Sequence, residues 1–196
     1  MAFVAHDGDK VNFFMVASSG GPVRKLCEDC GNQNLLNWSP SGTGLLYYSG
    51  WPIRVGLLNI VSGERRTVLE HPTYELSRDI LSPDERWIAF HVPAVQTGHS
   101  VFIAPLGQQP APEGDWIRVT RSGMDSWPFW SPDGRLLYFL SHRDGSRCVW
   151  AQPLDHATKQ PSACPSACFT STAPLPPDLA QRGRNGNVSH TRCPGL

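Results

Sequence analysis

The sequence lacks three features that would each assign it to a class of proteins. Its 17 Lys and Arg residues balance 17 Asp and Glu residues, so it has no basic footprint for nucleic acid. It has no run of 18 apolar residues, the length that a membrane-spanning helix needs. Residues 1–10 include acidic residues and no basic segment ahead of an apolar stretch, which is not the pattern of a signal peptide.

The motifs of common catalytic centres are also missing. The string His-Arg-Asp at 142–144 spells the start of a kinase catalytic loop, but Val149 occupies the position that needs a metal-binding Asn. There is no Gly-rich phosphate loop, no Asp-Phe-Gly and no Gly-x-Ser-x-Gly nucleophile elbow. Asp-Gly-Asp at 7–9 departs from the calcium-loop pattern at Val11. We therefore expect no catalytic residue, no cofactor and no metal site.

Cysteine is present, but not as a framework. The six Cys residues do not have the spacing of a small disulfide-stapled domain. Cys27 and Cys30 are the one pair whose spacing suggests a chemical role. A Cys-x-x-Cys can be a loop feature, a disulfide, a redox pair or half of a zinc site. The pair is not at a helix N-terminus, which disfavours a redox enzyme, and two further zinc ligands are lacking. We expect a loop pair or a disulfide without tightly held zinc.

A repeated turn is the strongest positive signal. Ser39, Ser82 and Ser131 each precede a proline and are 43 and 49 residues apart, close to the roughly 40–45 residues of one propeller blade. Ser-Pro-Asp-Gly suits a type I turn, because Pro presets φ at the second position and Gly relieves the last. The motif residues are Trp38, Ser39, Pro40 and Gly42, then Ser82, Pro83 and Asp84, and then Trp130, Ser131, Pro132, Asp133 and Gly134.

The strand after each turn is apolar on both faces. After the third turn, Leu136, Tyr138 and Leu140 fall on one face, and Leu137 and Phe139 fall on the other. A sheet with one face in water would alternate apolar and polar residues. Burial on both faces is what a blade needs when it packs between two neighbouring blades.

These signals predict an all-β fold, a partial, open β-propeller of three to four four-stranded antiparallel blades. We expect 14 strands, in a partial blade at 3–27, full blades at 34–70 and 77–120, and a partial blade at 127–154 that stops after its third strand. Residues 161–196 contain Pro and Cys without any period. We expect an irregular tail there, produced by a frameshift.

The motif resembles TolB-like, WD40-like propeller repeats, whose consensus is near Trp-Ser-Pro-Asp-Gly, Ile-Ala-Phe and then Asp-Gly. The strings at 25–31, 87–91 and 144–152 look like the C-terminal propellers of multidomain bacterial serine/threonine protein kinases, acidobacterial ones in particular. The resemblance covers about residues 3–160. It implies a fragment of a larger kinase-like parent, membrane-anchored with its propeller outside the cytoplasm.

Two functions fit such a module. The first is a non-enzymatic sensor or scaffold that presents one propeller face to a protein or a small ligand. The alternative is the substrate-gating propeller of a prolyl-oligopeptidase-like hydrolase whose catalytic domain lies elsewhere.

The tryptophans and the end blades suggest where contacts would form. Trp38 and Trp130 share a repeat position and are expected in the blade core, whereas Trp51, Trp116 and Trp127 lie near loops and are candidates for an interaction face. Incomplete end blades would expose apolar faces and strand edges, so we expect the isolated chain to self-associate.

Overall fold

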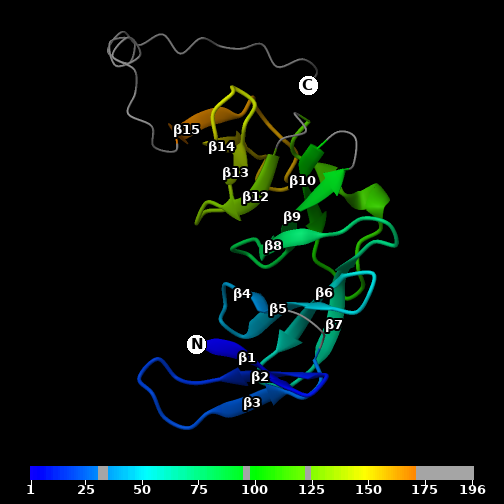
Figure 1. The fold of residues 1–196 in the computed structure, drawn as a ribbon. Helices are drawn as coiled ribbons and strands as arrows, with labels where there is room; N and C mark the ends of the chain where they lie inside the picture. Colours follow the sequence, from blue (N-terminus) through cyan, green and yellow to red (C-terminus); the bar gives the residue numbers. More distant parts are fainter. Residues whose placement is uncertain (31–34, 95–97, 122–124, 171–196) are drawn as a thin grey trace.

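The computed structural model of the protein describes residues 1–30, 35–94, 98–121 and 125–170. Their strands form four antiparallel sheets, each built from strands that are consecutive in the chain. Figure 1 shows the sheets following one another along a curved arc, with β4, β8 and β12 on its inner side. Within these ranges, none of the helical structure has the length and apolar character to cross a bilayer.

The first sheet has three strands and the other three have four each. The first contains β1 (Ala2–Asp7), β2 (Lys10–Met15) and β3 (Arg24–Cys27). The second contains β4 (Leu35–Trp38), β5 (Gly44–Ser49), β6 (Arg54–Asn59) and β7 (Arg65–Glu70). The third contains β8 (Ser77–Leu81), β9 (Trp87–Ala94), β10 (Gly98–Pro105) and β11 (Ile117–Arg118), with the short 3₁₀ turn η1 (Glu113–Asp115) before β11. The fourth contains β12 (Asp125–Trp130), β13 (Leu136–Ser141), β14 (Cys148–Pro153) and β15 (Ser166–Thr170).

The predicted all-β architecture of blade-like antiparallel sheets is confirmed, with one correction in the last sheet. That sheet was expected to stop after its third strand, but β15 pairs with β14, so regular structure extends past residue 160. Pro161 and Pro165 precede β15 and no proline lies within it, which leaves every N–H of the strand able to donate to a ladder. The predicted irregular, frameshifted tail otherwise falls on residues 171–196, outside the described residues.

The Ser-Pro turns join each inner strand to its neighbour. In the third turn, the Gly134 N–H donates to the Ser131 carbonyl (2.9 Å), and Gly134 has a φ of +66° that favours glycine. The Ser131 hydroxyl donates to the Asp133 carboxylate (2.6 Å) and accepts the Leu136 N–H (2.9 Å). The buried hydroxyls of the other two turns accept the equivalent N–H groups, Ser39 from Gly44 and Ser82 from Trp87.

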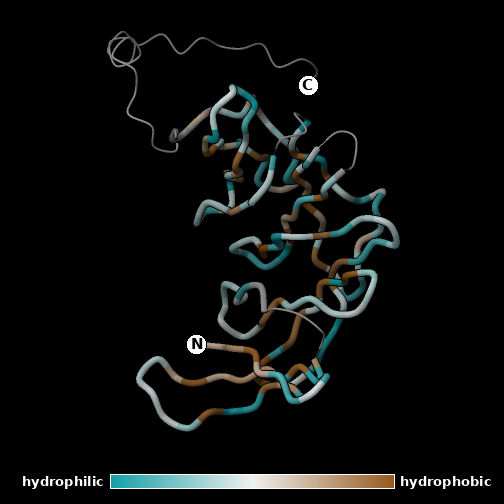
Figure 2. Tube along the Cα trace, in the orientation of Figure 1, coloured by the Kyte–Doolittle hydropathy of each residue, from teal (hydrophilic) through white to brown (hydrophobic). Residues whose placement is uncertain are grey.

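Adjacent residues of a strand serve different blade interfaces, as the two-faced apolar pattern predicts. Leu45 and Leu46 are neighbours in β5 and both are buried. Leu45 belongs to the core against the first sheet, and Leu46 to the core against the third. Figure 2 shows the brown, hydrophobic segments concentrated in the strands. This packing holds each sheet to the next.

The fourth sheet differs on its far face. Leu137 and Phe139 are fully buried in the core against the third sheet. Leu136, Tyr138 and Leu140, predicted for the opposite face, are only partly buried. No other described sheet packs on that face.

Gly56 offers a direct test of blade packing. It lies opposite Tyr47 in the β5–β6 pair, and an added Cβ would come within 2.7 Å of the Tyr47 hydroxyl oxygen and closer to its ring. The ring cannot move easily, because Tyr47 is buried and meets the Phe13 ring edge-on at 5.3 Å. We expect Gly56→Ala to lower the free energy of unfolding by about 1–3 kcal/mol, measured by urea denaturation.

The matched control is Gly114→Ala. An added Cβ at Gly114 has no neighbour within 4 Å. We therefore expect Gly114→Ala to raise the free energy of unfolding by at most about 1 kcal/mol. Equal stability of the Gly56→Ala variant and the unmodified chain would contradict the packing argument.

Candidate functional site

The repeat-motif residues serve the fold. Each motif lies in the turn after an inner strand, and its serine hydroxyl is engaged by the turn itself. In the second turn, Glu85 stands where the other turns have glycine and has a φ of +52°. Its carboxylate accepts the Ser41 N–H at 2.6 Å, which ties the turn of the third sheet to that of the second. These residues are therefore positioned for stability.

The two repeat tryptophans, both expected in the core, behave differently. Trp130 packs against the core between the third and fourth sheets, and its indole N–H donates to the Ile80 carbonyl at 3.3 Å. Trp38 is 37% exposed, which differs from the prediction. It lies opposite Leu45 on the side of β4 that faces the first sheet, and the three strands of that sheet cover it only in part.

The three loop tryptophans also differ in their exposure to solvent. Trp51 is 81% exposed and Trp127 is 44% exposed, so both are available for contacts. Trp116 is not, because it packs edge-on against Phe90 at 4.9 Å and donates its indole N–H to the Ala111 carbonyl. Trp116 therefore belongs to the core between the second and third sheets.

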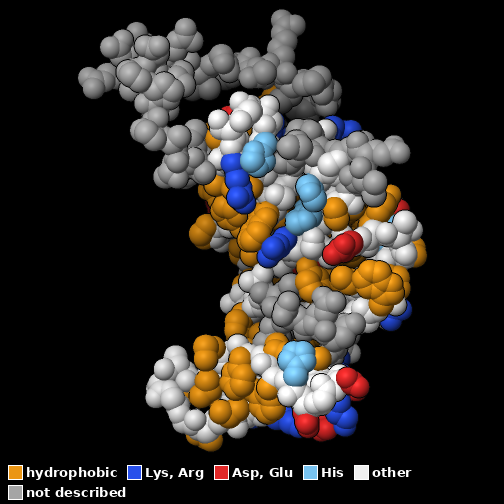
Figure 3. Space-filling view, in the orientation of Figure 1, with side chains coloured by type: hydrophobic (Ala, Val, Ile, Leu, Met, Phe, Trp, Pro, Cys, Tyr) orange, Lys and Arg blue, Asp and Glu red, His pale blue; other side chains and the backbone are white. Residues whose placement is uncertain are grey.

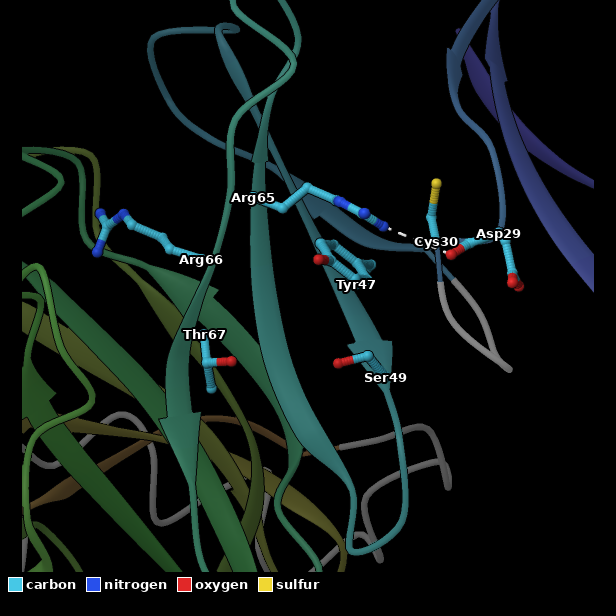
Figure 4. Close-up of a pocket in the computed structure, with 7 residues that line it drawn as sticks. All are labelled: Asp29, Cys30, Tyr47, Ser49, Arg65, Arg66 and Thr67. Atoms are coloured by element: carbon cyan, nitrogen blue, oxygen red, sulfur yellow. Dashed lines mark hydrogen bonds between the residues drawn. The ribbon is translucent and has the colours of Figure 1, made fainter.

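Cys27 and Cys30 form a disulfide, so neither sulfur is a thiolate that could bind zinc. Cys30 borders a hollow of about 320 Å³ between the first two sheets, which Figure 4 shows. Its lining residues are Asp29, Cys30, Tyr47, Ser49, Arg65, Arg66 and Thr67. In the described ranges, no group of three or more His, Cys, Asp or Glu side chains is arranged to hold a metal ion.

The two arginines of this hollow do not converge on a common point. Arg65 donates to the Asp29 carbonyl at 3.4 Å, and Figure 4 shows Arg66 extending in the opposite direction, where it donates to the Gly107 carbonyl. Both guanidinium groups are thus used to hold neighbouring loops. The hollow offers little for a charged ligand.

A second group of side chains lies where the inner strands break their pairing. We call it the inner-edge cluster; its members are Tyr48, Ser77, Arg78, Asp79, His91 and Trp127. The β8–β9 register shifts between Ser77 and Ile80, and the β12–β13 register shifts between Ser126 and Phe129.

The two shifted segments meet. Arg78 and Trp127 have φ values of +60° and +56°, an uncommon conformation for such residues. The Arg78 guanidinium carbon lies 3.8 Å from the centroid of the Trp127 ring, so residues from the third and fourth sheets form one stacked pair at the surface.

Asp79 is fully buried beside this pair. None of the described residues donates a hydrogen bond to either carboxylate oxygen. Burial raises the pKa of Asp79 to about 7, against a weaker opposing effect of the nearby Tyr48 hydroxyl. Its backbone carbonyl accepts the Asn37 side-chain N–H at 3.2 Å, and this bond holds the residue in place.

His91 is the second buried titratable group. One ring nitrogen lies 2.8 Å from the Ser77 hydroxyl, and the other has no partner in the described part of the chain. Burial, with smaller contributions from His99 and Arg78, lowers the pKa of His91 to about 4. Sequence reasoning named Trp127 as a candidate for an interaction face but missed the other members of this cluster, although the charged Arg-Asp pair at 78–79 was a visible irregularity.

These two groups predict opposite pH effects on stability. Asp79 keeps its proton when folded up to about pH 7, whereas the unfolded chain loses it near 3.8. Its contribution is therefore present below about pH 4 and is lost as the pH rises through 7. His91 stays neutral when folded down to about pH 4, whereas the unfolded chain binds a proton below 6.5. Its contribution is present above pH 6.5 and is lost as the pH falls through 4.

We expect the two effects to offset each other between about pH 4 and 6.5 in the unmodified chain. Asp79→Asn removes the contribution to stability that falls as the pH rises. The free energy of unfolding of this variant, relative to that of the unmodified chain, should therefore rise with pH across this window. His91→Gln should show the reverse trend. Urea unfolding at half-unit pH steps measures both differences, and a pH-independent difference for Asp79→Asn would show that its carboxyl group titrates normally.

No protein-family model matches the sequence. Over 136 residues, the chain is 30% identical to a protein of Sulfurisphaera tokodaii described as a tricorn-like protease C-terminal subunit; the match covers 69% of this chain and 15% of that protein. The chain thus corresponds to a small part of this relative. Neither this relative nor the TolB and tricorn structures are kinases, so the kinase-like parent stays a prediction without support.

Two solved structures are similar to this chain in fold. TolB from Acinetobacter baumannii matches 78% of this chain and 38% of its own, with a TM-score of 0.60 and 16% identity. The tricorn protease matches 77% of this chain and 17% of its own, with a TM-score of 0.52 and 17% identity. The chain is an all-β protein of propeller blades, similar in fold to the TolB and tricorn propellers.

Proposed function

We propose that this chain is a non-catalytic propeller module that binds peptides for a peptide-hydrolysing protein of the tricorn type. The observation that carries the proposal is the 30% identity over 136 residues to the tricorn-like protease subunit. This favours the substrate-gating alternative over a kinase-linked sensor. Because the match covers 15% of that relative, the hydrolytic chemistry is assigned to another part of the whole protein.

The chemistry of the exposed side chains supports binding. Trp51 and Trp127 present large apolar rings to solvent, and aromatic side chains are enriched where proteins bind partners. Arg78 adds an exposed positive charge beside Trp127. Together they offer apolar and charged contacts to a flexible chain, whereas the hollow beside the disulfide has its arginines already engaged.

A second candidate is an interaction module that binds a folded protein. The exposed rings of Trp51 and Trp127 also support this candidate, because exposed aromatic side chains can be covered by a folded partner. The two candidates differ in the state of the ligand, because a peptide filter binds unfolded chains and an interaction module binds a folded surface.

Fluorescence anisotropy separates the two. With a fluorescein-labelled tryptic digest of casein as the probe, we expect saturable binding to the 196-residue chain and no rise in free amino groups over hours. Labelled, folded ubiquitin is the control and should not bind. Absence of binding to the digest at protein concentrations up to about 1 mM, which corresponds to only about 4 kcal/mol, would reject the peptide-binding function. Cleavage of the digest would reject the non-catalytic assignment.

A further inference from the structure

The Arg78–Trp127 pair has the features of a built binding surface. The two residues occupy equivalent repeat positions, 49 residues apart like Ser82 and Ser131. Each lies in a bulge of an inner strand and has a positive φ. Their strands belong to two complete four-stranded sheets that contact each other.

The charge of Arg78 is available. Among the described residues, its guanidinium group forms no ion pair and no hydrogen bond, and it stacks on the Trp127 ring. Stacking uses the face of the guanidinium plane, which leaves the N–H donors at its edge free to bind a carboxylate in a two-pronged geometry. By contrast, Arg143 is paired with the buried Asp125 at 2.9 Å.

Neither the neighbouring carboxyl group nor the adjacent histidines neutralise this charge. Asp79 follows Arg78 in the chain but is fully buried and holds its proton below about pH 7. The nearest titratable groups on β9 and β10 are His91 and His99, whose rings meet at 5.4 Å, and neither adds negative charge. Figure 3 shows basic, His and acidic side chains beside hydrophobic ones over this part of the arc. An acidic group of a ligand would be complementary to the Arg78 guanidinium group.

The bulges also limit how a peptide can bind. An extended peptide can add to a free strand edge through its backbone, but bulges twist an edge away from such pairing. The inner edges of β8 and β12 are both interrupted at the residues in question. Recognition here must therefore rest on side chains of the ligand.

We propose that the Arg78–Trp127 pair is a subsite for an internal Asp or Glu side chain of an extended peptide. The Arg78 guanidinium binds the carboxylate, and the exposed part of the Trp127 ring packs against an adjacent apolar side chain of the peptide. This subsite rests on the proposed function and adds to it a preference for acidic peptide segments.

The test uses two peptides that differ at one residue. Both are ten residues long, acetylated and amidated at their ends, with a central Glu or Gln between two Phe residues, so that the Glu side chain is the only carboxylate. We expect the Glu peptide to bind the 196-residue chain about three- to tenfold more tightly at low salt, the range of a single charge-assisted contact. The preference should shrink in 0.5 M NaCl because salt screens exposed charges.

Three variants locate the preference. Arg78→Asn, which tolerates the positive φ, should abolish it while leaving affinity for the Gln peptide within about twofold. Arg78→Lys keeps the charge but loses the planar fork, and should reduce the preference to below about twofold. Arg135→Asn removes the same charge from an exposed position in the turn after β12 and should keep the full preference.

Each other outcome overturns a stated claim. Equal binding of both peptides by the unmodified chain overturns the subsite and leaves the peptide-binding function intact. Loss of preference in Arg135→Asn as large as in Arg78→Asn overturns the location, since it would reflect overall charge. If neither peptide binds while the casein digest does, the subsite is rejected and the peptide-binding function is retained. If the digest also fails to bind, both proposals are rejected.

Discussion

A buried serine hydroxyl at the end of each inner strand fixes the register on which each repeated blade depends. Ser39, Ser82 and Ser131 are all buried, and each hydroxyl accepts the N–H of the residue five positions later. That bond closes the turn and fixes which residues of the next strand face each way. Since a one-residue slip would exchange the two faces of a strand, the hydroxyl also determines which residues meet at each blade interface.

Register in turn places the irregular part of the inner strands. Pairing is regular next to the turn, where Leu81 faces Ile88 and Trp130 faces Leu137, and it breaks two to three residues earlier. The bulges therefore lie at equivalent positions, the same number of residues before the turn, in the third and fourth sheets. This is why Arg78 and Trp127 can stack although they are 49 residues apart. The surface pair is a consequence of two turns that have the same geometry.

The sequence was sufficient for the features that are local. Turn chemistry, spacing and two-faced apolar strands each have a direct physical interpretation, and they predicted the all-β fold of antiparallel blades. β15 was missed because its pairing depends on the free edge of β14, and prolines around it suggested irregular chain. The exposure of Trp38 was missed because a repeat position does not reveal how much of a neighbouring sheet covers it.

The inner-edge cluster was beyond sequence reasoning for a further reason: its members come together only through two register shifts. Arg78 and Trp127 contribute little to the core, so the repeat can vary at these positions with small effects on stability, and the equivalent residues differ in kind while the turn motif persists. Asp79 is the exception, because a buried carboxylate is costly and burial raises its pKa so that it keeps its proton. Its protonation removes the negative charge directly next to Arg78 in the chain. The same burial that raises the pKa of Asp79 thus leaves the neighbouring guanidinium group free for an external acid.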